Sequence, residues 1–235
     1  MLNIISLPSS LYVDNFVNAI RISRMDIYVW NSMFNSIITV VLITICSFIV
    51  GYFISRFSFK GRRIIFLMFV AGMLIPVHSL LVPLFIQYRM IGMLDNRFTL
   101  LPVYFAFGMP IAIFLMDSFI GGIPIELEEA AMIDGSSLPR TMFTIIMPLC
   151  RPVIATITIL SFMNAWNEFP FALVLLRDTA LRTIPIGLRA FQGAHTSNYT
   201  QFMAGMVIAL LPVILIYVLF YKKIIVGMSA GAIKG

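Results

Sequence analysis

The sequence predicts an all-α polytopic membrane protein with five transmembrane helices and a further helix outside the membrane. Of its 235 residues, 60% are hydrophobic and only 11% are charged, whereas about a quarter of the residues of a typical soluble domain are charged. The apolar residues also fall into five long runs of about 20 residues, the length that a helix needs to cross the hydrocarbon core. This composition excludes an ordinary soluble or disordered protein, and the runs lack the alternation of β-barrel strands.

The five predicted spans cover residues 33–54, 64–86, 98–116, 152–176 and 202–221. Three of them are uncharged, whereas the second carries His78 and the fourth carries Glu168. His78 lies between Pro76 and Pro83, a pattern that favours a packed kink in the second span. A role for His78 in a gate or a solute path is the alternative interpretation.

Basic residues in short loops predict the orientation of the spans. Arg56, Lys60, Arg62 and Arg63 follow the first span, and such clusters favour the cytoplasmic side. Residues 1–32 are therefore predicted to be extracytoplasmic, residues 33–225 to form the transmembrane domain, and residues 226–235 to form a cytoplasmic tail. Three glycines in this tail argue against a stable helix.

The extracytoplasmic placement of residues 1–32 needs an explanation, because this segment has no cleavable signal pattern. A further helix upstream would translocate it, and we expect one in longer relatives. The net charge of +6 is explained by topology, so no nucleic-acid partner is predicted. The two cysteines suggest no disulfide, and zinc patterns and phosphate-binding loops are absent from the sequence.

The loop of residues 120–148, between the third and fourth spans, predicts a helix–glycine–helix outside the membrane. Pro124 suits the first turn of a helix, and Glu126, Glu128 and Glu129 follow where the helix dipole favours negative charge. Gly135 is placed for a C-terminal cap with positive φ.

Ser136 and Ser137 can cap a second short helix that has Pro139 in its first turn and ends near Pro148. On the first helix, one face combines Ile123, Leu127, Ala130 and Ala131. Such a face suits either docking of a partner or packing against the rest of the chain.

Polar residues in the fourth span are candidates for a translocation path. They are Asn164, Asn167 and Glu168, with Trp166 between them. Amide and carboxylate groups bind sugar hydroxyls, and the indole offers an apolar ring face. The alternative is helix–helix hydrogen bonding within the membrane.

The loop resembles the signature motif of ABC importer permeases. The matching residues are Glu129, Ala130, Ala131, Asp134, Gly135, Ile145 and Pro148. The segments Ser161–Phe169, Thr183–Leu188 and Gly227–Gly235 further resemble the smaller permease of the carbohydrate, maltose-type branch. The resemblance extends from about residue 10 to the end of the chain.

This resemblance implies a type I ABC importer permease core, with the first loop helix as the coupling helix. It implies partner ATPase subunits that bind ATP and magnesium, a second permease, and an extracytoplasmic binding protein that faces the loop containing Arg182, Pro185 and Gly187. The chain itself would carry no cofactor and no catalytic residue, and would lie in the cell membrane with its C-terminus in the cytoplasm.

Three features depart from the pattern of that branch. Met147 stands where the motif usually has leucine, Asp117 stands where a basic residue is common, and the chain shows five spans where six are usual.

The resemblance as a whole implies that the protein imports a sugar or an oligosaccharide. An importer of another solute, such as glycerol phosphate or a polyamine, and a gradient-driven secondary transporter are the alternatives.

Overall fold

The computed structural model describes residues 13–21, 24–191 and 199–232, and all regular structure within them is helical. The predicted all-α class is thus confirmed. The N-terminal half contains α1 (Asp14–Arg21), α2 (Met25–Arg56), α3 (Arg62–Gly72), the 3-10 helix η1 (Val77–Leu80), α4 (Leu81–Met90) and α5 (Leu100–Gly121). The second half contains α6 (Glu126–Ile133), α7 (Leu138–Arg140), the π-helix η2 (Thr141–Ile146), α8 (Met147–Leu149), α9 (Arg151–Asn167), α10 (Pro170–Leu175), the 3-10 helix η3 (Thr179–Leu181), α11 (Ile184–Ala190) and α12 (Tyr199–Ala232).

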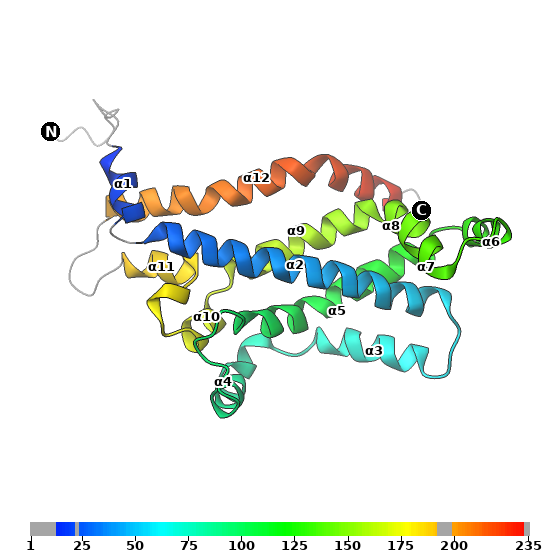
Figure 1. Ribbon diagram of the computed structural model, residues 1–235, viewed down its shortest axis with the longest axis horizontal. Helices are drawn as coiled ribbons and strands as arrows, with labels where there is room; N and C mark the ends of the chain where they lie inside the picture. The colour runs from blue at the N-terminus through cyan, green and yellow to red at the C-terminus, as the bar shows by residue number, and fades with distance from the viewer. Residues whose placement is uncertain (1–12, 22–23, 192–198, 233–235) are drawn as a thin grey trace.

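The long helices α2, α5, α9 and α12 form a bundle whose axes follow the longest dimension of the molecule (Figure 1). Helix α2 packs against both α5 and α9, and α12 packs against α9. One end of the bundle carries α6, α7 and the turn between α2 and α3, and α12 ends there too. The opposite end carries α1 and α11.

Three of the described helices are long and apolar enough to span a membrane without interruption: α2, α5 and the part of α12 from Tyr199 to Leu219. The number rises to five if each of two bent helix pairs forms one span. The predicted number of spans therefore agrees with the structure only when interrupted helices are counted.

The second predicted span, residues 64–86, is broken rather than continuous. Helix α3 ends at Gly72, and the segment from Val77 to Met90 leaves it at an angle of 87°. Pro76 explains the break, because it lacks an N–H donor and disfavours a helical conformation at the preceding residue. The kink predicted around His78 is present as this sharp bend, but His78 itself is exposed.

The fourth predicted span, residues 152–176, is also interrupted. Helix α9 ends at Asn167, Glu168 adopts an extended conformation, and Pro170 begins α10. Because Pro170 has no N–H to donate to the preceding helical turn, α9 cannot continue through it. On its other side, α9 is bent by 75° from the segment Leu138–Leu149.

The outer bounds of the first and last spans differ from the prediction as well. Helix α2 begins at Met25, eight residues before the predicted span, so the end of the 1–32 segment belongs to it. Helix α12 continues to Ala232 and includes two of the tail glycines. Each glycine weakens a helix by only about 1 kcal/mol, which a long apolar span tolerates.

Candidate coupling site, cavity and outer surface

The loop between α5 and α9 forms the predicted helix–glycine–helix. Helix α6 begins at Glu126, two residues after Pro124, and ends at Ile133. Gly135 follows with φ +80°. The N–H of Gly135 donates to the carbonyl of Met132 (3.0 Å), and the N–H of Ser136 donates to that of Ala131 (2.9 Å). These two hydrogen bonds form a Schellman cap, which confirms the predicted role of Gly135.

The second helical segment of the loop is less regular than predicted. It consists of α7, the π-helix η2 and α8, and π-helical turns are frequent at functional sites. Ser137 occupies the N-cap position but makes no capping hydrogen bond with its side chain. Instead, Thr141 donates its hydroxyl to Ser136 Oγ at 3.0 Å. The predicted serine cap is therefore wrong, because the hydroxyl of Ser136 is engaged by a residue farther along.

The motif residues of this loop divide into two groups. Glu129, Ala130, Asp134 and Gly135 are exposed around α6 and its cap. Ala131, Ile145 and Pro148 pack wholly or partly into the protein, and Ile145 contacts the buried cluster that contains Phe48 and Ile146. The predicted apolar face of α6 is thus split, because Ala131 is buried whereas Leu127 and Ala130 remain exposed.

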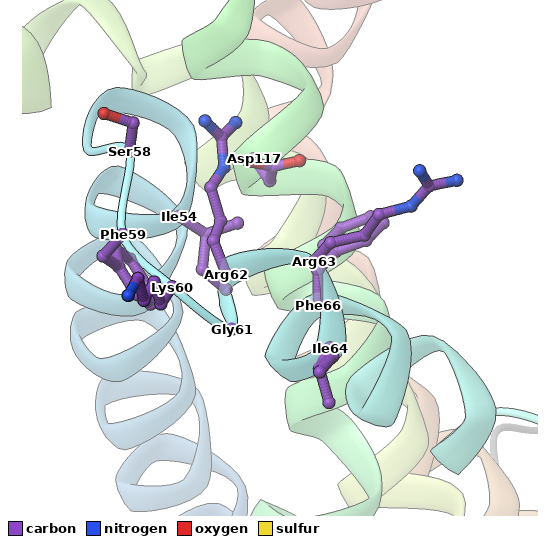
Figure 2. A pocket seen from close by; sticks show the side chains of 10 residues that line it. All are labelled: Ile54, Ser58, Phe59, Lys60, Gly61, Arg62, Arg63, Ile64, Phe66 and Asp117. Atoms are coloured by element: carbon purple, nitrogen blue, oxygen red, sulfur yellow. The ribbon is translucent and has the colours of Figure 1, made fainter.

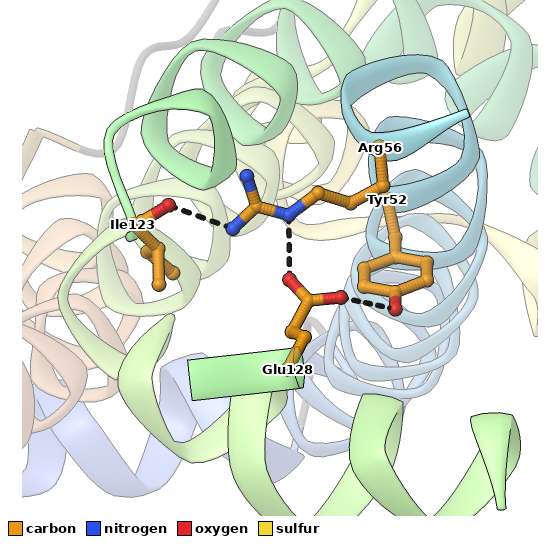
Figure 3. A network of polar contacts seen from close by, with 4 residues as sticks. All are labelled: Tyr52, Arg56, Ile123 and Glu128. Atoms are coloured by element: carbon orange, nitrogen blue, oxygen red, sulfur yellow. Dashed lines mark hydrogen bonds and ion pairs between the residues drawn. The ribbon is translucent and has the colours of Figure 1, made fainter. Parts of the chain in front are cut away.

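The most extensive network of polar contacts in this region involves Glu128. From the sequence, this residue is predicted only to interact favourably with the dipole at the start of the helix. Its side chain is 2% exposed and forms an ion pair with Arg56 Nε at 2.6 Å. Tyr52 donates its hydroxyl to the other carboxylate oxygen at 2.6 Å, and Arg56 also donates to the carbonyl of Ile123 at 2.8 Å (Figure 3).

These hydrogen bonds and the ion pair connect α6 to the C-terminal end of α2, which lies more than 70 residues earlier in the chain. The pair has two further partners, Tyr52 on the same face of α2 as Arg56 and the carbonyl of Ile123 in the turn before α6. The carboxylate and the guanidinium therefore have hydrogen-bond partners although both are buried. Several apolar side chains of α6 and of the residue before it remain exposed. They are Ile125, Leu127, Met132 and Ile133, the last of which is 87% exposed.

A cavity of about 300 Å³ lies between α2, η1, α5 and α9. Its polar lining residues are Thr39, His78, Tyr104, Ser161, Asn164 and Glu168. Two of the four predicted path residues, Asn164 and Glu168, thus line the cavity. Trp166 is buried elsewhere, stacked on Phe162 at 5.3 Å between ring centroids, and Asn167 is exposed at the end of α9 without lining the cavity.

Glu168 also has a structural role at this cavity. Its carboxylate accepts hydrogen bonds from the N–H groups of Phe171 (2.6 Å) and Ala172 (3.0 Å), and so caps α10. Tyr104 of α5 donates its hydroxyl to the same carboxylate at 2.9 Å. The predicted alternative of helix–helix hydrogen bonding is therefore present, and the same side chain borders the cavity.

At the opposite end of the bundle, the segment after α10 is fixed to α2. The side-chain amide of Asn31 donates to the carbonyls of Ala180 (2.8 Å) and Arg182 (2.9 Å). The N–H of Ile184 donates to Ser32 Oγ at 2.9 Å. This segment is therefore folded onto the bundle; residues 192–198 of the predicted loop lie outside the described residues.

The three predicted residues of this segment have different surroundings. Pro185 lies in the first turn of α11, and Gly187 lies so close to α2 that an added Cβ would be 2.1 Å from Tyr28 Cδ2. Arg182 borders a surface pocket of about 420 Å³ together with Arg177 and Arg189. Among the described residues, none of these three arginines forms an ion pair.

The fold and these sites define a multi-pass membrane protein with a helix–glycine–helix held at one end of the bundle by a buried ion pair. Comparison with known proteins identifies its family. The family model described as "binding-protein-dependent transport system inner membrane component" matches residues 44–227, and the chain belongs to this family.

Relatives and solved structures agree with this assignment. The chain is 38% identical to a protein of a Caldicellulosiruptor species named as an ABC transporter permease, over 97% of this chain and 83% of the relative. It is 36% identical to the arabinooligosaccharides transport system permease protein of Halalkalibacterium halodurans, over 97% of this chain and 81% of the relative. A crystal structure of a bacterial ABC transporter that imports the acidic polysaccharide alginate matches with a TM-score of 0.79 and 25% identity, and the match covers 92% of this chain and 81% of that one.

Proposed function

We propose that this chain is the membrane permease subunit of an ATP-driven importer that takes up a sugar or an oligosaccharide. The observation that carries the proposal is the exposed helix α6, capped by Gly135 and fastened to α2 through Glu128. Membership of the family supports the class of transporter. The names of the relatives, which refer to arabinooligosaccharides and alginate, support a carbohydrate as the solute.

In this proposal, ATPase subunits bind ATP and magnesium and receive α6 in a surface cleft. The exposed side chains Ile125, Leu127, Met132 and Ile133 supply the apolar contact that a helix makes in a groove. Closure of the ATPases displaces α6. The displacement reaches α2 through the Glu128–Arg56 pair and reaches α9 through the packed segment 138–149, as a rigid-body transition between two states.

The solute path is proposed to include the cavity beside Asn164 and Glu168. Asn164 and His78 are exposed although they lie within predicted spans. Exposed polar groups in a membrane segment usually face protein or a water-filled cavity rather than lipid. We therefore expect a second permease subunit to cover this face and to complete a path lined by groups that bind hydroxyls.

An extracytoplasmic binding protein is proposed to dock at the end of the bundle opposite to α6. Arg177, Arg182 and Arg189 surround the pocket there and would attract acidic side chains of the partner. In this orientation α6 and the end of α12, which lie at the same end of the bundle, are both cytoplasmic.

Sugar uptake by cells that produce the complete set of subunits tests the proposal. Uptake should require the ATPase subunits and should stop when their ATP hydrolysis is abolished. A cysteine in place of Ile133 should form a disulfide cross-link with a cysteine in the cleft of the ATPase, whereas a cysteine in place of Val41, on the membrane surface of α2, should not. Uptake that persists without any ATPase would overturn the proposal and favour a gradient-driven transporter.

A further inference from the structure

We propose that the turn between α2 and α3 binds the phosphate headgroup of an anionic phospholipid. A pocket of about 800 Å³ lies at this turn, at the end of the bundle that carries α6. It is lined by Ile54, Ser58, Phe59, Lys60, Gly61, Arg62, Arg63, Ile64, Phe66 and Asp117 (Figure 2). The proposal does not depend on which solute the protein transports.

The charges of the pocket favour an anion. The lining contains three basic residues, Lys60, Arg62 and Arg63, and a single carboxylate, that of Asp117, so cationic groups exceed anionic groups by two. Within the described part of the chain, the side chains of these three basic residues make no ion pair or hydrogen bond. By contrast, the nearby Arg56 is neutralised by Glu128. The lining of the pocket therefore carries a net positive charge.

The arrangement of the basic groups suits a headgroup better than a small ion. Figure 2 shows Arg62 reaching toward Asp117 at the end of α5, whereas Arg63 points away from it and Lys60 lies on the opposite side of the turn. The cations are therefore spread along the pocket rather than directed at one point. Gly61, with φ +91°, allows the tight turn that separates Lys60 from Arg62.

The apolar part of the pocket distinguishes a lipid from a free anion. Ile64 is 66% exposed and Phe59 is 43% exposed beside the basic groups. On the adjoining surface of α3, Leu67 and Met68 are 51% and 69% exposed. A ligand that joins a phosphate to acyl chains can contact both parts at once, whereas inorganic phosphate can use only the first. Clusters of basic residues beside a membrane span attract anionic lipids in this way.

Native mass spectrometry of the full chain in detergent provides the test. The protein is titrated with dioleoylphosphatidylglycerol and, separately, with dioleoylphosphatidylcholine, and a third arm adds millimolar inorganic phosphate to the phosphatidylglycerol titration. Each basic residue near an anionic lipid contributes roughly a fivefold factor in affinity. The double variant Arg62→Gln/Arg63→Gln should therefore bind phosphatidylglycerol about 30-fold more weakly, and phosphatidylcholine should bind weakly to every variant.

The matched control is Arg140→Gln/Arg151→Gln, which removes two exposed arginines, one at the end of α7 and one at the start of α9, and should leave lipid binding unchanged. Lys60→Gln, a single exposed change that leaves the turn intact, should weaken binding about fivefold and keeps the test valid if the double variant does not fold. Equal binding of the two lipids, or equal losses in the double variant and its control, would overturn the proposal. Displacement of phosphatidylglycerol by inorganic phosphate would also overturn it, because the site would then recognise a free anion.

Discussion

The buried pair between Glu128 and Arg56 should be essential for both the stability of the α6–α2 junction and the coupling of ATP hydrolysis to transport. The informative change is Glu128→Gln, which keeps the size of the side chain and removes its charge. The matched control is Glu126→Gln, which changes an exposed carboxylate of the same helix that makes no hydrogen bond or ion pair with the described residues.

The magnitude follows from the burial of the pair. Removing one partner of a buried ion pair costs about 3–5 kcal/mol, because the other charge is left uncompensated. Glu128 and Arg56 are 2% and 9% exposed, so both charges are buried and this range applies to the loss of the Glu128 carboxylate. The low end, about 3 kcal/mol, is the better value, since Arg56 lies at the end of its helix and keeps its bond to the carbonyl of Ile123. For a chain of this size, a loss of about 3 kcal/mol corresponds to roughly 6–12 °C in melting temperature.

The assay compares thermal unfolding of the assembled transporter with the ratio of solute transported to ATP hydrolysed. Glu128→Gln should lower both the melting temperature and this ratio, whereas Glu126→Gln should change the melting temperature by less than about 2 °C, as surface substitutions usually do. Identical melting temperatures and transport ratios for the two variants would refute the assignment of the pair as the junction between α6 and α2.

Three further predictions concern the cap, the cavity and the outer surface. Gly135→Val should strain the backbone by about 1–2 kcal/mol at its positive φ and reduce transport more than ATP hydrolysis. Gly61→Val also places valine at a positive φ but lies outside the coupling loop, so it should leave the ratio of solute transported to ATP hydrolysed unchanged. Equal ratios for the two variants would contradict a special role of the cap. Tyr104→Phe should destabilise the protein by roughly 1.5–3 kcal/mol in thermal unfolding, because it removes a hydrogen bond to a charged group. The control, Tyr88→Phe, should change little, because Tyr88 is also buried but its hydroxyl makes no hydrogen bond with the described residues. Arg189→Gln should weaken stimulation of ATP hydrolysis by the binding protein and reduce its dependence on salt concentration; an unchanged salt dependence would argue against docking at this surface.

The coupling loop was largely predictable from the sequence because its signals are local. A glycine after three acidic residues and an apolar repeat predicts a short capped helix, and Gly135 closes that helix with the expected hydrogen bonds. The long apolar runs likewise predict helices of membrane length. Their interruptions are harder to predict, because the mean hydropathy of a run is almost unaffected by a break. Pro76 and Pro170 lie within runs that are apolar on average.

The contacts that hold the site together could not be predicted, because they join residues that are far apart in the sequence. Glu128 and Arg56 are separated by 72 residues, and Asn31 meets the carbonyl of Arg182 across 151 residues. In the sequence, Glu128 is one of three similar acids. Only the rotation of α6 decides that this one turns inward, together with Ala131 three residues later. For the same reason Trp166 points into a different helix interface from Asn164, two residues earlier.

Helix α2 links the two ends of the bundle for which functions are proposed. It contains 32 residues, which corresponds to about 48 Å at 1.5 Å per residue, more than the hydrocarbon thickness of about 30 Å. Near its start, Asn31 and Ser32 hold the segment that precedes α11, and near its end Tyr52 and Arg56 hold α6. Because α2 has no break between these points, the proposed displacement of α6 would be carried to the opposite end of the bundle without an intervening hinge. The interrupted spans adjoin the cavity instead: η1 contributes His78, and the break after α9 contributes Glu168. In the proposed mechanism, the continuous helix transmits the motion of α6, and the broken helices change the lining of the cavity between the two states.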